Sequence, residues 1–267
     1  YSNYVSVEAD PAAGEELQKL VDAGFVREFG SHEEVRQYLG SRPVLSKLAM
    51  VVKIQADKIK RRLILDCRTS GSNSRAVQTE RIILPMVTDV VDDAMAFLCR
   101  AEAGQGVSFM VLDFTDAFYN LPLCPDERRY YAAYYQGRYL VWVRVAQGSK
   151  NGPQLFGRCS AMAGRFLQAT LDPHEARAHT FVDDPIVVLL GTPERRNINS
   201  ALAVLVWRCL GFGLAFHKGQ RGAAVQWVGH ELRVDASSLQ ASIKAEFTQE
   251  FENTARDILK SNVISLK

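Results

Sequence analysis

The feature that most constrains the fold is a pair of adjacent acids inside an apolar, β-branched run, "TFVDDPIVVLL" at residues 180–190. Apolar runs of this kind are normally buried, whereas two neighbouring carboxylates resist burial without a partner. The run therefore predicts two strands joined by a turn that carries Asp183 and Asp184. No Lys or Arg lies within the run. A divalent metal ion would relieve the repulsion between the acids, because hard Mg²⁺ prefers carboxylate oxygens.

A third acid is expected from a neighbouring strand. Asp113 ends the apolar stretch "FMVLD" just as Asp183 follows "TFV", so two strands would deliver acids at matching positions. Such a set suits a two-metal site for in-line phosphoryl transfer, although each acid could instead cap a strand end or a turn. The similar doublet Asp92-Asp93 lies near the start of an expected helix, where acids suit the helix dipole, and is interpreted as a solvated first turn.

The remaining pattern predicts an α+β fold. Helices are expected over residues 11–23, 31–40, 88–101, 153–171, 195–210 and 245–261, and strands over 48–54, 62–67, 107–114, 138–146, 213–217 and 225–232. This order lacks βαβ regularity, which argues against a doubly wound sheet. Ser31 is expected to cap its helix and Gly40 to end it.

Apolar spacing predicts which face of two helices is buried. The inward residues are expected to be Val91, Ala94, Met95 and Leu98 in the helix over 88–101, and Phe247, Phe251, Ile258 and Leu259 in the helix over 245–261. Such stripes at helical spacing normally face a core.

Composition narrows the class of protein. At 267 residues, 47% hydrophobic and 23% charged, the chain is typical of a globular protein, and its net charge of +2 gives no global basic field. Basic charge is concentrated at residues 53–68, with six Lys/Arg against two Asp.

Cysteine usage and targeting signals indicate the compartment. Five scattered cysteines without C-x-x-C argue against a disulfide framework or zinc site and favour a reducing intracellular setting, cytoplasmic or nuclear. No signal peptide and no apolar run long enough for a membrane span is present. The chain begins with Tyr rather than Met, and is interpreted as a piece of a longer polypeptide.

Six motifs in order carry a family resemblance. They are "KRRLILDCRTSGSN" (60–73), "LDFTDAFYNLPL" (112–123), "AQGSKNGPQLFGR" (146–158), "FVDD" (181–184), "LGFGLAFHKG" (210–219) and "VQWVGHEL" (225–232). The series resembles the successive palm motifs of reverse transcriptases, most closely those of retrotransposons and retroviruses. The resemblance implies a right-hand polymerase, with fingers at 1–86 and 122–146, palm at 87–121 and 147–232, and the start of a thumb or connection at 233–267.

The resemblance also implies the catalytic site of an RNA-directed DNA polymerase. Asp113, Asp183 and Asp184, with the backbone carbonyl of Phe114, would hold two Mg²⁺ ions, for which Mn²⁺ could substitute. The ions would activate a primer 3′-hydroxyl and neutralise the triphosphate.

Further residues would bind the nucleotide and the primer. Asp116 and Ala117 would lie under the triphosphate, Phe118 would exclude a ribose 2′-hydroxyl, and the Gln147-Gly148 pair would line the pocket. Arg62 and Lys53 would cover the triphosphate from the basic hairpin. Lys218 would protonate the leaving pyrophosphate, and Trp227 and Gly229 would grip the primer end.

Three departures from the family pattern accompany these matches. Val145-Ala146 replaces Leu-Pro, Phe181 replaces the commoner Tyr, and Pro185 directly follows the acids. Because Pro185 removes a backbone donor from the returning strand, a catalytically degenerate palm that only binds nucleic acid or partners remains an alternative. An RNA-dependent RNA polymerase is another, against which the bulky Phe118 argues.

The resemblance implies the partners as well. They are an RNA or DNA template with its primer and deoxynucleoside triphosphates, with no membrane. Flanking RNase H, integrase or recombinase domains would lie outside this chain.

Overall fold

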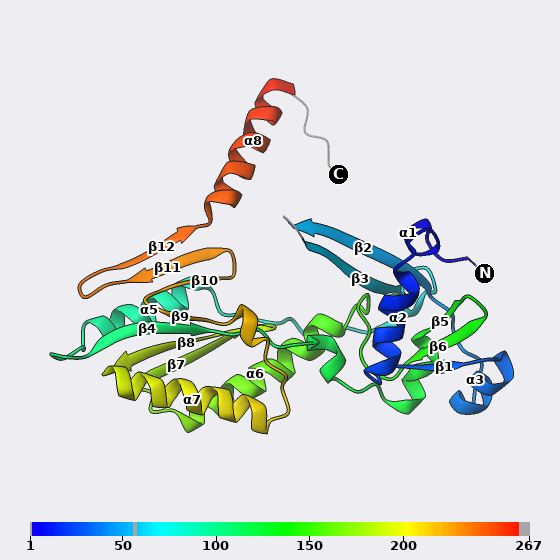
Figure 1. Ribbon diagram of the computed structural model, residues 1–267, viewed down its shortest axis with the longest axis horizontal. Coiled ribbons are helices and arrows are strands. Elements are labelled where there is room, and N and C mark those ends of the chain that lie inside the picture. The colour runs from blue at the N-terminus through cyan, green and yellow to red at the C-terminus, as the bar shows by residue number, and fades with distance from the viewer. Residues whose placement is uncertain (1, 56–57, 262–267) are drawn as a thin grey trace. The chain divides into compact units, whose positions relative to one another are not determined.

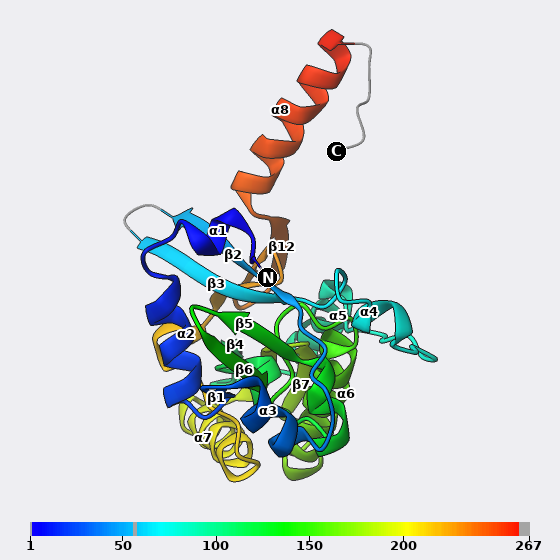
Figure 2. The ribbon, with the colours of Figure 1, turned by 90° about the vertical axis from the view of Figure 1, so that its right-hand side faces the viewer.

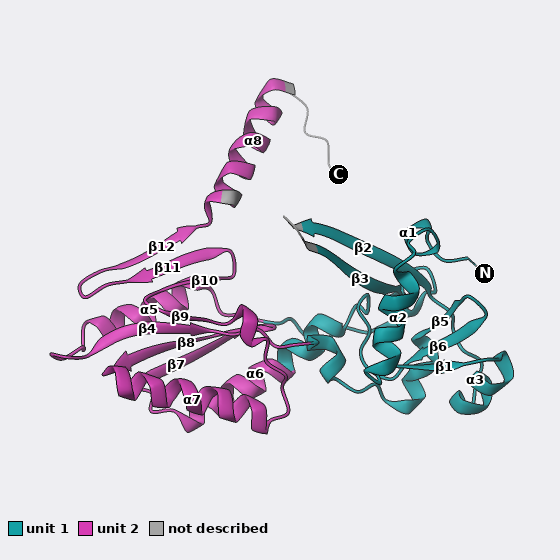
Figure 3. Cartoon of the chain, in the orientation of Figure 1, with its two compact units in different colours: residues 1–82, 116–158 teal, residues 83–115, 159–267 magenta. Residues whose placement is uncertain are grey.

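The computed structural model describes residues 2–55 and 58–261, and the chain forms two compact units (Figure 3). Unit 1 comprises residues 1–82 and 116–158, and unit 2 comprises residues 83–115 and 159–267. The paired strands of the described residues are antiparallel, so the mixed helix and antiparallel-sheet class is confirmed. These boundaries differ from the sequence-based divisions after residues 86, 121, 146 and 232. The assignment to fingers, palm and thumb stays a prediction.

Unit 1 contains a three-stranded sheet and a separate hairpin. The sheet has the order β1-β6-β5, from Val26–Phe29, Arg138–Trp142 and Ala132–Tyr135, and the hairpin pairs β2 (Lys47–Gln55) with β3 (Lys58–Asp66). Its helices are α1 (Val5–Glu8), α2 (Ala13–Asp22), α3 (His32–Leu39), α4 (Ser72–Arg75) and the 3₁₀ turns η1 (Ala117–Asn120) and η2 (Pro125–Tyr130). The expected strands 48–54 and 62–67 are thus confirmed and somewhat longer, whereas α1 and β5 were not expected.

Capping determines where α3 begins and ends. The backbone N–H of Glu34 donates to Ser31 Oγ at 3.2 Å, and the Glu34 carboxylate accepts the N–H of Gly30 at 3.0 Å. Gly40 ends the helix with φ +63°, a conformation that glycine adopts without steric cost. The sequence-based prediction of both ends is confirmed.

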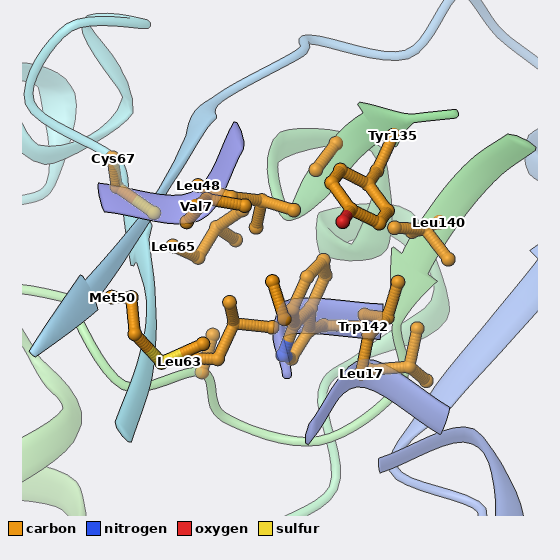
Figure 4. Packing of buried hydrophobic residues seen from close by; sticks show 14 of the residues in the cluster. Val7, Leu17, Leu48, Met50, Leu63, Leu65, Cys67, Tyr135, Leu140 and Trp142 are labelled. Atoms are coloured by element: carbon orange, nitrogen blue, oxygen red, sulfur yellow. The ribbon is translucent and has the colours of Figure 1, made fainter. Parts of the chain in front are cut away.

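Unit 1 is held together by a large apolar cluster and by a smaller one around Val35, Ala132 and Val141. Leu17 of α2, Leu48 and Leu65 of the hairpin, and Leu140 and Trp142 of β6 are all at most 1% exposed and pack around one another (Figure 4). Helices α1 and α2 lie beside the hairpin (Figure 2). Burial of the large cluster secures the inner end of the β2–β3 hairpin.

Unit 2 is built on a four-stranded sheet of order β7-β8-β4-β9. These strands are Ala176–Phe181, Asp184–Gly191, Gly106–Val111 and Gln220–Gly222, and a second sheet joins β10 (Ala224–Trp227), β11 (His230–Val234) and β12 (Leu239–Ile243). The helices are α5 (Val87–Leu98), α7 (Pro193–Cys209), α8 (Ala245–Ser261) and the 3₁₀ turn η3 (Phe216–Lys218); α6 (Gly152–Thr170) begins in unit 1 and continues here.

The four-stranded sheet is covered on both faces. Helix α5 and the second sheet lie on one face, and α6 and α7 lie on the other (Figure 1). Phe109 and Val111 of β4 pack with Val90 and Phe97 of α5 and with Trp227, whereas the alternate residue Met110 points to the α7 side. Burial on both faces explains why β4 and β8 are nearly continuous apolar runs.

Of the two predicted helix faces, that of α5 is largely confirmed and that of α8 is wrong. In α5, Ala94 is buried and Val91 and Leu98 are partly buried against the core, beside the buried Val90 and Phe97, but Met95 is 44% exposed. In α8 all four residues expected to face inward are exposed: Phe247, Phe251, Ile258 and Leu259.

The strand predicted over residues 213–217 is wrong. Residues 213–217 form a single bridge, Phe114 to Leu214, followed by η3 rather than a strand. Within residues 2–55 and 58–261, no helix combines the length and apolar character needed to cross a bilayer.

Candidate active site

Two neighbouring strands of unit 2 bring the three predicted acids together. Strands β4 and β8 pair antiparallel with Val111 opposite Ile186, so the end of β4 meets the start of β8. The N–H of Leu112 donates to the carbonyl of Pro185 at 3.1 Å, and the N–H of Phe114 donates to the carbonyl of Asp183 at 3.0 Å. Asp113 therefore lies beside the turn that carries Asp183 and Asp184.

Electrostatics confirm that these carboxylates interact. Burial, followed by the negative charges of Asp183 and Asp113, raises the pKa of Asp184 to about 6, and the nearby ammonium of Lys218 partly opposes the shift. Lys218 Nζ lies 2.7 Å from Asp113 Oδ2. One lysine thus faces three acids, and the site retains excess negative charge when all three are ionised.

The donor set has the chemistry of a magnesium site, since carboxylate oxygens are the ligands that Mg²⁺ prefers. Among residues 2–55 and 58–261, however, no three His, Cys, Asp or Glu side chains are gathered closely enough to hold one ion. Lys218 Nζ takes the position beside Asp113. The magnesium sites therefore stay a prediction, and loading would require Asp113 to exchange this ammonium for an ion.

The turn between β7 and β8 is strained. Phe181 pairs with Asp184, which leaves Val182 and Asp183 as a two-residue loop, and Val182 has φ +55°. A β-branched residue rarely adopts this left-handed conformation, which costs of order 1–3 kcal/mol. Strain of this kind is commonly found at functional sites.

Pro185 fits this hairpin without a bulge. It lies opposite Thr180, one pair beyond the residues that flank the loop. In a two-residue hairpin the flanking pair exchanges hydrogen bonds and the next pair does not. The missing N–H of Pro185 is therefore not needed by β7, and Asp184 keeps its place in the ladder.

A second hairpin is tied to the acidic turn. Trp227 pairs with His230 across the loop of Val228 and Gly229, whose φ values are +44° and +78°. The indole N–H of Trp227 donates to the carbonyl of Asp184 at 2.9 Å, and the side chain is 2% exposed. Trp227 is thus a core residue that also fixes the backbone of an acid. Its expected role at a primer end, like that of Gly229, stays a prediction.

The interpretation of the second acidic doublet as a solvated first turn is wrong for Asp93. Helix α5 begins at Val87, and its first-turn acid is Asp89. Asp93 Oδ2 lies 2.8 Å from His179 Nε2 on β7, and Asp93 Oδ1 lies 3.9 Å from Arg177 Nε. Sequence reasoning missed this link because the partners are far apart in the chain and neither forms a motif.

Aromatic packing behind Asp113 was also missed. The ring of Phe114 meets Trp207 edge-on, with centroids 5.6 Å apart, and lies 4.7 Å from the ring of Phe212. Phe114 and Trp207 are at most 2% exposed. This packing anchors the residue whose carbonyl was predicted as a metal ligand.

Unit 1 contains Asp116, Ala117 and Phe118, three of the residues predicted to contact the nucleotide. Asp116 has φ +53° and precedes η1, which contains Ala117 and Phe118. Phe118 is half-buried and packs edge-on against Phe156, with centroids 6.2 Å apart. These residues form a tight turn with a ring fixed by the core, and their roles toward a nucleotide stay predictions.

Gly148 approaches the backbone of β3. The N–H of Leu65 donates to the carbonyl of Gln147 at 2.9 Å. Gly148 has φ +107°, and a Cβ there would lie 2.1 Å from the carbonyl oxygen of Leu65. The protein's own backbone therefore requires glycine at this position, whether or not a ligand binds.

The basic residues of the hairpin share a face with this glycine. Lys53 lies opposite Lys60, and Arg62 lies opposite Val51, so these side chains alternate onto the same face. On the same face, Val51 and Gly148 border a pocket of about 740 Å³ together with Tyr4, Val5, Ser6, Ala49, Ile64, Asp66, Arg68 and Asn73. The charged residues that line this pocket are Asp66 and Arg68, and a triphosphate-binding role for Arg62 and Lys53 stays a prediction.

No protein-family model and no curated protein matches the sequence, but solved structures resemble the fold. A foamy viral protease-reverse transcriptase dRH in complex with double-stranded DNA has a TM-score of 0.66 at 16% identity, covering 100% of this chain and 38% of that chain. The foamy viral protease-reverse transcriptase with double-stranded DNA has a TM-score of 0.65 at 15% identity, covering 100% and 46%. Its complex with an RNA/DNA hybrid has a TM-score of 0.62 at 15% identity, covering 95% and 29%.

These likenesses concern the fold. The chain spans less than half the length of each neighbour. It therefore has a fold like part of a reverse transcriptase, as the six motifs implied.

Proposed function

We propose that this chain is the polymerase portion of a retroelement reverse transcriptase, which adds deoxynucleotides to a primer 3′-hydroxyl on an RNA or DNA template. The observation that carries the proposal is the convergence of Asp113, Asp183 and Asp184 at adjoining strand ends within a fold like that of a reverse transcriptase. Phosphoryl transfer needs positioning and charge neutralisation, which a set of converging carboxylates can provide through bound cations.

The three carboxylates, helped by the carbonyl of Phe114, would hold Mg²⁺. When bound, two such ions would lower the pKa of the primer hydroxyl and neutralise the pyrophosphate leaving group. Trp227 and the packing around Phe114 keep the backbone of the acids in place. The residues of this chain thus orient the ligands and limit their motion.

Lys218 has two roles in this proposal. In the free protein its ammonium neutralises Asp113 across 2.7 Å. After release from Asp113 it would lie next to the phosphate leaving group, where it can donate a proton to pyrophosphate.

In unit 1, the basic hairpin would hold the triphosphate, Asp116 and Ala117 would donate backbone N–H groups, and Phe118 would select against a ribose. The bulk of Phe118 favours deoxynucleotides over the substrates of an RNA-dependent RNA polymerase.

The test is nucleotide incorporation on poly(rA)/oligo(dT) with Mg²⁺. Asp183→Asn keeps the size of the side chain and removes its charge, and we expect a loss of about 100-fold or more. Asp92→Asn is the matched control, because Asp92 is an exposed acid of the second doublet, and should incorporate at the wild-type rate. Equal rates for wild type and Asp183→Asn would refute the assignment of the acids.

An inactive palm that only binds nucleic acid is the second candidate, since the Lys218–Asp113 pair already neutralises one acid internally. Fluorescence anisotropy with a labelled primer–template separates the two. Binding without incorporation in wild type, unchanged by Asp183→Asn, would favour the inactive palm.

A further inference from the structure

A groove in unit 2 lies outside the carboxylate site. It has a volume of about 720 Å³ and runs between α7 and the β4–β9 side of the sheet. Met110 and Leu112 of β4, Val204 and Leu205 of α7, and Phe216 of η3 form its apolar walls. This volume is within the range of roughly 300–1,000 Å³ that is usual for small-molecule sites.

Helix α7 contributes the aliphatic residues Val204 and Leu205 to this groove. The buried stripe of α7 against the sheet contains the smaller or polar residues Asn199 and Ala203, together with Trp207. Leu205, by contrast, is 58% exposed, and Phe216 across the groove is 60% exposed. Large exposed apolar side chains that face one another are unusual on a soluble surface and often mark a binding site.

The charge of the groove is of one sign. Among the residues that the structure describes, its ionisable lining residues are Arg208 and Arg221, and no Asp or Glu lines it. Arg208 donates to the carbonyl of Phe212 at 3.4 Å, and Arg221 donates to Asn197 Oδ1 at 2.5 Å. A guanidinium carries five N–H donors, so both arginines keep donors for an anionic group.

We propose that this groove binds a small amphipathic anion, with an aromatic or aliphatic body against the apolar walls and a carboxylate, sulfonate or phosphate group on the arginines. Such a molecule matches both the apolar lining and the uncompensated positive charge. A nucleic-acid strand matches less well, because most of the wall offers it no polar partner.

The groove also lies next to the carboxylate site, because two of its lining residues are close in the chain to Asp113 and Lys218. Leu112 immediately precedes Asp113, and Phe216 lies two residues before Lys218. The turn is tightly packed, since a Cβ on Gly219 would lie 3.0 Å from Leu112 Cδ2. A ligand that displaces Phe216 or Leu112 would therefore disturb the Lys218–Asp113 pair, so occupancy should change activity. This second step rests on the proposed polymerase function.

Binding is tested with the fluorescent probe anilinonaphthalene sulfonate and its uncharged relative phenylnaphthylamine. We expect one saturable site for the sulfonate. Val204→Trp fills the groove and should weaken binding about tenfold or more, because over 50 Å² of apolar contact is lost, on the order of 1.4 kcal/mol. Met162→Trp, on the exposed surface of α6, is the matched control and should bind as wild type does.

Two further variants test whether the site prefers an anionic ligand and whether a loss of binding could instead result from misfolding. Arg208→Gln should weaken the sulfonate severalfold and leave the uncharged probe unchanged. Leu205→Glu alters an exposed residue and should abolish sulfonate binding with unchanged circular dichroism. Retained sulfonate binding in both Val204→Trp and Leu205→Glu would overturn the site, and equal effects of Arg208→Gln on both probes would overturn the anion preference.

Coupling is tested by incorporation with and without the sulfonate probe. The probe should slow the wild type and leave Leu205→Glu unaffected, and an unchanged wild-type rate at saturation would overturn the coupling. The fluorescence measurements need no catalysis, so they decide the binding site even if the polymerase activity is absent.

Discussion

At the scale of single residues, the conformation of the backbone can require a residue type that the family motif would explain by contact with a ligand. The family pattern relates Gly148 to a nucleotide pocket, yet the carbonyl of Leu65 already excludes a side chain there. Activity lost on substituting Gly148 would therefore not by itself demonstrate a nucleotide contact.

Gly148→Ala should destabilise unit 1 by about 3 kcal/mol or more, because it combines a positive φ with a backbone clash. Gly137 is the matched control. It has φ +82°, and nothing lies within 4 Å of its added Cβ, so Gly137→Ala should cost only about 1 kcal/mol. Urea unfolding measures both, and equal losses would show that the clash is relieved by movement of β3.

A buried carboxylate of unit 1 gives a pH dependence. Burial alone would raise the pKa of Asp66, but hydrogen bonds from the hydroxyls of Tyr4 and Thr69 and from Arg68 outweigh it and lower the pKa to about 2. The Tyr4 hydroxyl donates to Asp66 Oδ2 at 2.6 Å. The ionised form is thus stabilised in the folded state.

The stabilisation from Asp66 should be complete above the unfolded pKa of about 4 and lost as the pH falls through the folded pKa of about 2. It amounts to about 2 kcal/mol. Urea unfolding between pH 5 and 2.5 should show a shallower loss of stability in Asp66→Asn than in wild type. Parallel curves would contradict the assigned pKa.

At the scale of elements, the link between Asp93 on α5 and His179 on β7 joins a helix to the strand that leads into the acidic turn. Asp93 and His179 are both largely buried, at 28% and 17% side-chain exposure. Such a contact stabilises the fold more than an exposed ion pair does, because it pairs two polar groups that folding has partly removed from water.

Asp93→Ala should therefore destabilise unit 2 by about 1–2 kcal/mol, and Asp92→Ala on the exposed neighbour by less than about 0.5 kcal/mol. A double-mutant cycle with His179→Ala would show whether the effect depends on the pair. Additive losses would mean that Asp93 acts independently of His179, through the helix or through Arg177.

Local patterns predicted most elements, and long-range contacts account for what they missed. Helix α3 was predicted to its ends because its signals lie within ten residues of one another. The exposure of Met95 on α5 depends on how the helix packs, and the partner of Asp93 lies 86 positions away in the chain, so neither can be read from spacing. The apolar stripe of α8 was correctly periodic, but periodicity does not say what covers it.

The same distinction between local patterns and long-range contacts applies to the candidate site. The three acids could be singled out from the sequence because Asp113 closely follows one apolar strand, and Asp183 and Asp184 lie at the turn before another. The Lys218–Asp113 ion pair, the Trp227 hydrogen bond and the rings around Phe114 could not be predicted, since they arise only after the strands and α7 have packed. The roles of the unit 1 residues rest on the family resemblance alone.

At the scale of the whole molecule, each unit has its own apolar cluster. Leu140 in unit 1 and Ile186 in unit 2 are both fully buried members of these clusters. Each cluster consists of residues from one unit. Stability should accordingly be distributed in two parts, each responding to its own core.

Leu140→Ala should cost roughly 2–5 kcal/mol and increase hydrogen exchange mainly in peptides of β1, β5 and β6. Ile186→Ala should cost a similar amount and act mainly on β4, β7 and β8. Exchange measured by mass spectrometry on the same peptides checks both. A uniform increase across the chain in either variant would show that the two clusters unfold together.

The hydrogen bond from the indole of Trp227 to Asp184 also makes the acidic turn observable. The chain has three tryptophans: Trp142 in the core of unit 1, Trp207 against Phe114, and Trp227 at the turn, edge-on to Phe181. A Trp142→Phe, Trp207→Phe protein would retain one native fluorophore whose ring N–H is bonded to an acid's own carbonyl. Without a label, its emission would report a change in the backbone of this turn, including one caused by the cation binding proposed above.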